Sequence, residues 1–521
     1  MRNRIPTALL GPVAGAAGLA AGHLTAAFVD PASSPVLAAG AAVIDRTPTP
    51  AKEWAIAHFG SHDKTVLIGG VLLVGLLAST LIGPLARRSR AAGVVAMVVL
   101  AAIAATCALT RPTADVRDAV ASAVTAVVAA GALLALLALV PAPRAGENGA
   151  GEHTAAENGA GENGAGEGGL ARRGVLALLG VAVLAGAVGE TGRRIMRVRG
   201  RAEAVTLPVP ASPAPDLPAG IEPMVPGMSP FRTPTDRFYR VDTRLDVPVI
   251  SSDSWQLTID GDVEHPFTLG YDDLLAMPMI ERDITLTCVS NSVGGPYVGS
   301  ARWLGVPLRD VLDRAGIGGT RADQLLSTDV SGMTITTPLA LATDGRDAMI
   351  AVGMNGAPLP REHGFPARMV IPGLYGFISA TKWLRRLTLT TYADHTAYWT
   401  KRGWATDAPI KISSRIDTPR PLQKLRAGET VVGGVAWAQR EGGVAAVEVS
   451  IDGGPWRPAT LGPSGGNDYW RQWYFRWNAT PGQHTVASRV TDGRGDVQTA
   501  RRADPYPNGA SGVQSIVVSV G

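Results

Sequence analysis

Cys288 is the residue of this chain whose side chain could take part in chemistry most directly. It ends an alternating segment, residues 284–288, that predicts a strand. After it we expect a loop with Gly294, Gly295 and Gly299 and then a helix that starts at Leu308. The chain has 2 cysteines, and the other one, Cys107, lies in an apolar run, so we expect no disulfide. A thiol in a glycine-rich loop can be a nucleophile or a metal ligand, whereas an isolated buried cysteine is only a small apolar side chain. From spacing alone, each of these interpretations stays open.

Two separate motifs narrow the interpretation. The segment TLTCVSN contains Cys288, and together with the GSARWLGVPLRDVL after it resembles the molybdenum-binding segment of the sulfite oxidase family. Residues 351–384 resemble a second signature of that family, MNG.PLP..HGFP.R...PG...G...KWL. The resemblance covers about residues 223–518. It implies a molybdenum–molybdopterin cofactor with the Cys288 thiolate as metal ligand, and a soft sulfur donor suits such a centre.

The resemblance also assigns roles to residues outside the cysteine segment. It places Arg240 beside the metal, as a catalytic and a cofactor-binding residue, and it places Asn291, His363, Arg368 and Lys382 at cofactor-binding positions. The pterin ends in a phosphate, which guanidinium and ammonium groups bind well. Without the matched motifs, these side chains would be interpreted as ordinary loop or surface residues.

Three departures from the family pattern concern the substrate. Arg240-Val241-Asp242 stands where sulfite oxidases have Arg-Asn-His, and Met333 stands near the position of their active-site tyrosine. Ser292 and Val293 replace an arginine pair after the cysteine. A site with less positive charge is expected to bind a dianion such as sulfite less well.

The expected function is a two-electron oxygen-atom transfer on a small substrate, as in sulfite oxidases. Activity like that of methionine sulfoxide reductases is an alternative, because those proteins share the fold. A second alternative is a non-enzymatic exported interaction module in which the molybdenum fold is a relic.

The composition limits the partners. The chain has 521 residues and a formal net charge of +4, and its basic residues form no tract with interleaved aromatics, so nucleic-acid binding is not expected. His23 is the single histidine within the predicted spans, whereas a transmembrane haem needs paired histidines. With no haem or flavin motif in the sequence, we expect a separate electron-transfer partner, either a protein or a quinone.

Residues 1–144 are expected to form a membrane region. Four apolar segments are long enough to cross about 30 Å of hydrocarbon as helices. They are residues 7–29, 65–85, 91–109 and 119–140. A Gly/Ala/Asn/Glu repeat at residues 145–171 predicts a disordered linker. Residues 172–190 begin with Arg172-Arg173 and resemble either a fifth transmembrane helix or a twin-arginine export signal.

Arginines determine the expected sidedness. Arg2 and Arg4, together with a group between the second and third spans, are typical of cytoplasmic segments; that group is Arg87, Arg88 and Arg90. Four spans then return the chain to the cytoplasm, and a fifth places the catalytic domain outside. Five arginines after the fifth segment oppose this translocation; they are Arg193, Arg194, Arg197, Arg199 and Arg201. We expect a multi-pass protein of the cell membrane with an extracytoplasmic catalytic domain.

The remaining chain divides into a linker, residues 191–222, and two domains. Residues 223–404 mix short strands and helices without strict alternation, which favours an α+β fold, and the resemblance makes this a sulfite-oxidase-type molybdopterin domain. Residues 405–521 show short alternating strands with Gly/Pro turns, which indicate an immunoglobulin-like β-sandwich. Its family counterpart is a dimerisation domain, so we expect a homodimer. The aromatic cluster Trp470, Trp473, Tyr474 and Trp477 would form either the interface or the core.

Overall fold

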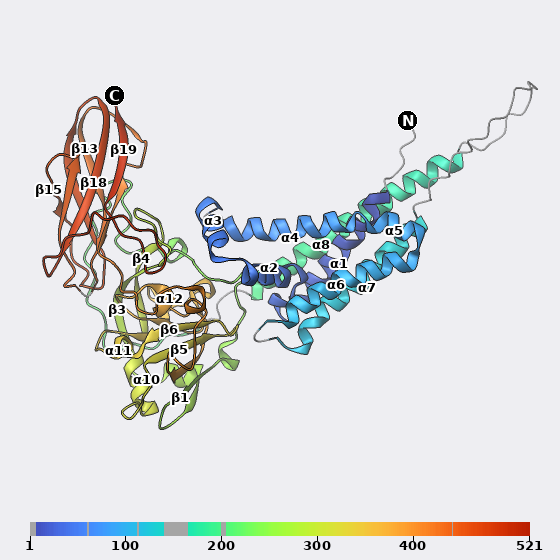
Figure 1. Ribbon diagram of the computed structural model, residues 1–521, viewed down its shortest axis with the longest axis horizontal. Helices are drawn as coiled ribbons and strands as arrows, with labels where there is room; N and C mark the ends of the chain where they lie inside the picture. Colours follow the sequence, from blue (N-terminus) through green and yellow to red (C-terminus); the bar gives the residue numbers. More distant parts are fainter. Residues whose placement is uncertain (1–6, 60–61, 112–113, 140–164, 200–204, 440) are drawn as a thin grey trace, which may run out of the picture. The chain divides into compact units, whose positions relative to one another are not determined.

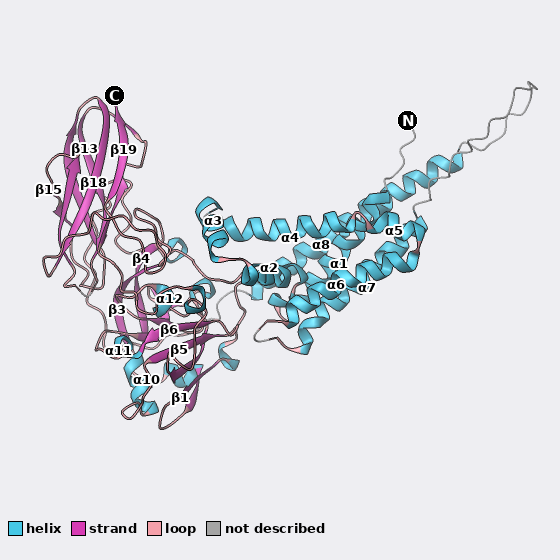
Figure 2. Cartoon of the chain, viewed as in Figure 1, coloured by secondary structure: helices cyan, strands magenta, loops and turns pink. Residues whose placement is uncertain are grey.

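The computed structural model describes residues 7–59, 62–111, 114–139, 165–199, 205–439 and 441–521. Arg2, Arg4 and most of the expected 145–171 linker lie outside these ranges. The chain forms a helical unit, Met1–Arg201 with Thr243–Val249, and a β-rich unit, Ala202–Asp242 with Ile250–Gly521 (Figures 1 and 2). The expected order, apolar helices before an α+β domain and a β-sandwich, is confirmed.

The helical unit contains long apolar helices joined by short ones. The helices are α1 (Leu10–Ala26), α2 (Pro35–Arg46), α3 (Thr49–Phe59), α4 (Asp63–Ser79), α5 (Ile82–Arg88), α6 (Arg90–Leu109), α7 (Ala119–Leu139) and α8 (Ala165–Arg199). Within the described residues, five helices are long and apolar enough to cross a membrane. These are Thr7–Ala26, Asp63–Arg88, Arg90–Leu109, Val116–Leu139 and Leu176–Ile195.

Small residues let α1 pack closely against its neighbours. A Cβ added at Gly18 would lie 2.6 Å from the carbonyl oxygen of Thr125 in α7, and one at Gly22 would collide with the Thr125 hydroxyl. In the same way, Gly11 lies against the backbone of Ser79 at the end of α4. Such close backbone approach is a common way for apolar helices to associate in a membrane.

Helix α8 runs parallel to α1. At one end, Leu178 of α8 belongs to a buried cluster that includes Leu10 of α1 and Ile82 of α5. At the other end, a Cβ on Gly192 would lie 3.2 Å from Leu24 near the end of α1. The start of α8 is therefore at the same end of the helical unit as the start of α1 and Arg87.

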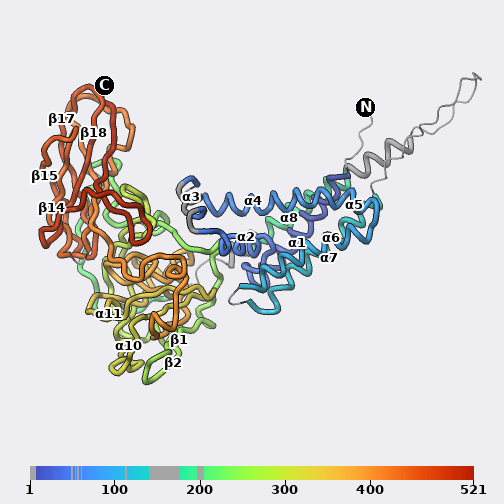
Figure 3. Tube along the Cα trace, in the orientation of Figure 1, coloured from blue at the N-terminus to red at the C-terminus, as the bar shows by residue number. Residues whose placement is uncertain are grey.

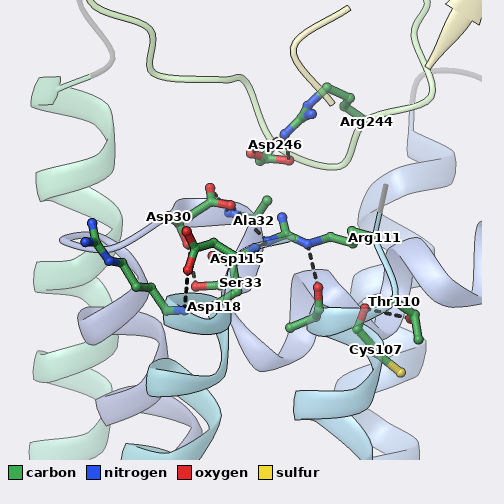
Figure 4. Close-up of polar contacts among 12 residues, drawn as sticks. Asp30, Ala32, Ser33, Cys107, Thr110, Arg111, Asp115, Asp118, Arg244 and Asp246 are labelled. Atoms are coloured by element: carbon green, nitrogen blue, oxygen red, sulfur yellow. Dashed lines mark hydrogen bonds and ion pairs between the residues drawn. The ribbon is translucent and has the colours of Figure 1, made fainter. Parts of the chain in front are cut away.

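An ion-pair cluster joins the loops at the opposite end of these helices (Figure 4). Arg111, just after α6, contacts Asp30 at 2.9 Å and Asp118 at 2.5 Å. The carboxylate of Asp118 also accepts a hydrogen bond from the backbone N–H of Asp115. One guanidinium thus links the segment after α1 to the segment before α7.

The first domain of the β-rich unit has two sheets. Their strands are β1 (Gln256–Gly261), β2 (Phe267–Gly270), β3 (Ile280–Thr287), β4 (Val298–Pro307), β5 (Gln324–Asp329), β6 (Thr334–Pro338), β7 (Met349–Met354), β8 (Ala357–Pro358), β9 (Arg368–Val370) and β10 (Leu384–Thr390). The orders are β2-β1-β10-β5-β6 and β3-β4-β7-β8, with β9 on β7. The helices are α9 (Tyr271–Leu275), α10 (Leu308–Ala315), α11 (Leu339–Ala342) and α12 (Gly376–Ser379). Antiparallel pairing dominates, as expected for an α+β fold.

The second domain, whose backbone trace Figure 3 shows at the red, C-terminal end of the colour range, is a sandwich of two sheets. Its strands are β11 (Ser413–Thr418), β12 (Lys424–Leu425), β13 (Gly428–Trp437), β14 (Val444–Ile451), β15 (Arg457–Pro458), β16 (Thr460–Leu461), β17 (Arg471–Ala479), β18 (Gly482–Asp492) and β19 (Gln514–Val520). The sheet orders are β11-β13-β17-β16 and β12-β19-β18-β14-β15. Alternating apolar residues from both sheets form the core between them.

The aromatic cluster proposed as a dimer interface packs inside the chain. Trp473 and Trp477 belong to the sandwich core, and Trp470 belongs to the core of the first domain. Tyr474 packs against a small cluster that includes Val225. The core interpretation of these aromatics is therefore confirmed, and the homodimer stays a prediction without this support.

Candidate active site

Cys288 directly follows β3, and the loop after it closes back onto the cysteine. The backbone N–H of Cys288 donates to the carbonyl oxygen of Tyr297 at 3.0 Å, and the amide oxygen of Asn291 accepts from the N–H of Tyr297 at 2.8 Å. Cys288 is 8% exposed. Burial raises the pKa of its thiol, and hydrogen bonds from Ser290 and the charge of Lys382 act in the opposite direction. A bound cation at the sulfur would favour the thiolate.

Asn291 has a clear structural task in this loop. Besides its bond to Tyr297, its side chain lies where a Cβ on Gly295 would come within 2.6 Å of the amide oxygen. The glycine at this position is therefore needed for the loop to close around Asn291. Contact of Asn291 with a cofactor stays a prediction.

Two of the expected cofactor-binding side chains, Arg368 and His363, are buried together. Arg368 begins β9 and donates from Nη1 to the carbonyl oxygen of His363 at 3.1 Å. The His363 ring is 3.1 Å from the carbonyl oxygen of Thr235, through Nε2. Burial lowers the pKa of Arg368 to about 10, and burial with the charges of Arg368, Lys382 and Arg240 lowers the pKa of His363 to about 4. His363 is thus neutral at physiological pH beside charged groups.

Lys382 and Arg240 meet at one carboxylate. The Asp242 Oδ2 atom lies 2.6 Å from Lys382 Nζ and 2.8 Å from Arg240 Nε. The side chains of Lys382 and Asp242 are 9% and 6% exposed, whereas that of Arg240 is 31% exposed. Burial lowers the pKa of Lys382 to about 8 although Asp242 raises it. The replacement by aspartate noted in the sequence thus supplies an internal anion for two of the expected site cations.

Tyr239 is a candidate site residue that the sequence analysis did not select. Its phenol is close enough to Cys288 and Arg368 for both to influence it. Burial and the negative charge of Cys288 raise the pKa of Tyr239, and the guanidinium of Arg368 lowers it. By contrast, Met333 lies in the β5–β6 turn, where its backbone N–H donates to Asp329. The position of Tyr239 directly before Arg240 in an aromatic pair was the available signal.

The described residues suit an anionic, sulfur-rich metal cofactor. Arg368 is a buried cation whose described hydrogen bonds go to backbone carbonyl oxygens, and burying a charge is costly unless an opposite charge accompanies it. The buried thiol of Cys288 is the soft donor that such a metal requires. The residues therefore fit molybdopterin chemically.

Comparisons with known proteins give the same result. Residues 244–399 match the family described as oxidoreductase molybdopterin binding domain. Mitochondrial sulfite oxidase of Homo sapiens is 31% identical over 311 residues, which covers 50% of this chain and 56% of that protein. Sulfite oxidase of Gallus gallus is 31% identical over 288 residues, covering 47% and 62%, respectively. The chain thus spans little more than half the length of these relatives.

A solved structure shows a more distant likeness. The sulfane dehydrogenase SoxCD of Paracoccus pantotrophus aligns with a TM-score of 0.48 and 24% identity, covering 56% of this chain and 83% of that one. The fold and the matched domain define a molybdopterin-binding oxidoreductase. More narrowly, about half of the chain is similar to sulfite oxidases.

Proposed function

We propose that this chain is a membrane-anchored molybdenum-cofactor oxidoreductase that catalyses two-electron oxygen-atom transfer on a small substrate. The observation that carries the proposal is the buried thiol of Cys288 beside the buried cations Arg368 and Lys382, within a matched molybdopterin-binding domain. When bound, the cofactor supplies the redox chemistry. The chain supplies binding, orientation and exclusion of water.

Each site residue has a proposed task. Cys288 binds the metal, and Arg368, Lys382 and His363 hold the anionic and polar parts of the pterin. Asn291 holds the loop and contacts the cofactor. We assign Arg240, the most exposed of these cations, to the substrate side of the site.

The tyrosine beside the cysteine has a proposed task as well. The phenol of Tyr239 keeps its proton at physiological pH because burial raises its pKa. With the cofactor bound, it would be able to donate a hydrogen bond to an oxygen of the substrate.

Asp242 bears on the choice of substrate. Because it already neutralises part of the charge of Lys382 and Arg240, the site attracts a dianion less than it would with a neutral residue there. The contacts of Asp242 with Lys382 and Arg240 therefore favour binding of an uncharged substrate, such as a sulfoxide, over binding of sulfite. Reduction of methionine sulfoxide is therefore the second candidate activity, and it would take electrons from a separate electron carrier. Oxidation of sulfite would instead pass electrons to such a carrier.

The packing of α8 supports a catalytic domain outside the cytoplasm. Arg87, Arg88 and Arg90 are typical of the cytoplasmic side, and α8 begins at that end of the helical unit and ends at the other. Glu190 pairs with Arg193 at 2.9 Å and with Arg194 at 3.3 Å, which offsets part of the positive charge after the span.

The experiment that tests the proposed function uses the purified full chain in detergent. Molybdenum is measured per chain, and turnover is measured with sulfite and an electron acceptor, and with methionine sulfoxide and an electron donor. About one molybdenum per chain and turnover of either substrate supports the proposal. A chain that binds no molybdenum after expression with the cofactor pathway contradicts it.

A further inference from the structure

The strand that carries Cys288 is completed by the β-sandwich. β3 is at the edge of its sheet, with β4 on one side. On its other side, the backbone N–H of Thr285 donates to the carbonyl oxygen of Asp468 at 2.9 Å. The Thr285 carbonyl accepts from the side chain of Gln439 at 2.7 Å, and its hydroxyl accepts from the N–H of Trp470 at 2.8 Å. Residues of the sandwich therefore satisfy the polar groups of β3 three residues before the cysteine.

The loop after Cys288 is also held from the sandwich. Arg415 of β11 donates from Nη1 to the carbonyl oxygen of Gly295 at 3.1 Å. The same guanidinium donates from Nη2 to the hydroxyl of Ser229 at 2.8 Å and from Nε to Asp417 at 2.6 Å. Arg415 is only 9% exposed, so these bonds form away from water. A planar guanidinium can make all three at once, which a lysine cannot.

A second sandwich residue fills the space beside Gly294. This glycine has φ of +79°, and a Cβ there would lie 2.6 Å from the Nε2 atom of Gln514 in β19. The Oε1 atom of Gln514 accepts from the backbone N–H of Ile416 at 2.7 Å, so its side chain is fixed in place. Side chains from both sheets of the sandwich thus reach the same loop.

A displacement of Gly294 and Gly295 would also displace Cys288, because the loop between them is short and closed by hydrogen bonds. The Cys288 N–H bonds to Tyr297, and Asn291 bonds to the same residue from within the loop. The carbonyl of Ser292 also accepts from the N–H of Gly295 at 2.8 Å. These hydrogen bonds connect Gly295 to the backbone of Cys288, so a displacement of the glycine would be transmitted to the cysteine.

We propose that Arg415 and Gln514 are positioning residues for the Cys288 loop, so that the β-sandwich forms part of the framework of the active site. The proposal rests on the proposed role of Cys288 as metal ligand. It gives the sandwich a task within one chain, whether or not the chain dimerises. A ligand sulfur displaced by about 1 Å can cost about 100-fold in rate, so holding this loop matters for turnover.

The first test uses hydrogen exchange in the full chain in detergent, prepared without cofactor. Arg415→Lys keeps a charge beside Asp417 but loses the fork that reaches Gly295. The matched control is Arg489→Lys, because Arg489 pairs through Nε with Glu448 at 2.8 Å in the other sheet of the sandwich. We expect amides of residues 289–297 to exchange about tenfold faster in Arg415→Lys, the factor that loss of a charge-assisted hydrogen bond implies. The control should leave these amides unchanged.

The second test follows the thiol directly. In a Cys107→Ser background, the rate at which iodoacetamide alkylates Cys288 should rise in Arg415→Lys and in Gln514→Ala. Ser229→Ala removes the hydroxyl that accepts from Nη2 of Arg415 and should leave the alkylation rate near that of the parent chain. If Arg415→Lys does not fold, Gln514→Ala alone decides the question. Unchanged exchange and alkylation in the folded variants would overturn the proposal.

The loaded enzyme gives the last readout. Arg415→Lys should lower kcat with little change in KM and should shift the electron paramagnetic resonance signal of the half-reduced metal, whereas Arg489→Lys should do neither. If the chain binds no molybdenum at all, the proposed function fails, and the exchange and alkylation results still decide whether the sandwich holds the loop.

Discussion

Replacing Asp242 with asparagine should convert the site into one that prefers anions. Asparagine has nearly the same shape, but it cannot neutralise Lys382 and Arg240. In the variant, Arg240 is available to an anionic substrate, and the charge of Lys382 that Asp242 no longer neutralises makes the site more positive. We therefore expect kcat/KM for sulfite to rise relative to kcat/KM for methionine sulfoxide.

The size of the effect follows from burial. The contact between Lys382 and Asp242 is 2.6 Å long, with side chains 9% and 6% exposed, so water screens it little. A charge-assisted hydrogen bond of this kind contributes about 1.5–3 kcal/mol, which is about 10- to 150-fold in an equilibrium constant. Arg240 is 31% exposed, so its pair with Asp242 adds little after solvent screening. A rise of about tenfold for sulfite is the cautious expectation, with a change below about twofold for the uncharged sulfoxide.

The assay compares both substrates at low ionic strength in fully loaded enzyme. Asp283→Asn is the matched control, because Asp283 pairs with Arg302 at 2.6 Å and is also 6% exposed, but it contacts none of the candidate site cations in the described bonds. The control should lower stability without changing the ratio of the two substrates. Equal ratios in the wild type and Asp242→Asn would refute the reasoning.

Four further outcomes are expected. Cys288→Ser should abolish turnover while far-ultraviolet circular dichroism stays unchanged; full turnover in metal-loaded mutant protein would exclude the ligand role. Tyr239→Phe should lower kcat by about 10- to 100-fold, as expected for loss of a hydrogen bond to a charged group, with molybdenum content as control; unchanged kcat would contradict a role for the phenol. The pKa of Lys382 is lowered to about 8, so its charge is present below that pH and lost above it. Retention of the anionic cofactor on gel filtration should therefore weaken as pH rises through about 8, and Lys382→Gln should remove this dependence. The folding stability of the cofactor-free chain should change in the opposite direction. Above about pH 8 its unfolded state binds more protons than its folded state, so its stability rises with pH. Protease added to intact spheroplasts should digest the fragment that contains Cys288, and its protection would place the domain in the cytoplasm.

Local sequence signals predicted two of the elements near the cysteine, but the expectation of a loop up to Leu308 was wrong, because β4 (Val298–Pro307) begins before Gly299 and pairs with β3. The alternating pattern predicted the strand that ends before Cys288, and the start of α10 at Leu308 follows from the shift to helical periodicity. The apolar runs predicted the long helices of the helical unit. In these cases the pattern reports burial of one face by neighbours close in sequence.

Contacts between distant segments could not be read in this way. Arg415 and Gly295 are far apart in the chain, and neither lies in a pattern that signals the other. The alternation that places Trp473 and Trp477 on one face of a strand indicated that this face is buried. It did not indicate whether the face is buried in the core of the chain or in an interface between two chains. The position of Tyr239 depends on how the segment before Arg240 folds against β3 and β9, which no local propensity specifies.

The contacts of Gln514 have a consequence for how the protein is made. Since Gln514 follows Cys288 by more than two hundred residues, the loop after Cys288 lacks one of its supports until β19 has been synthesised. Pairings between residues so far apart also form slowly, because a long segment must be closed first. Insertion of the cofactor is therefore expected to follow the pairing of β19 with its sheet, and a substitution that destabilises this strand should impair maturation although the strand contains no proposed cofactor-binding residue.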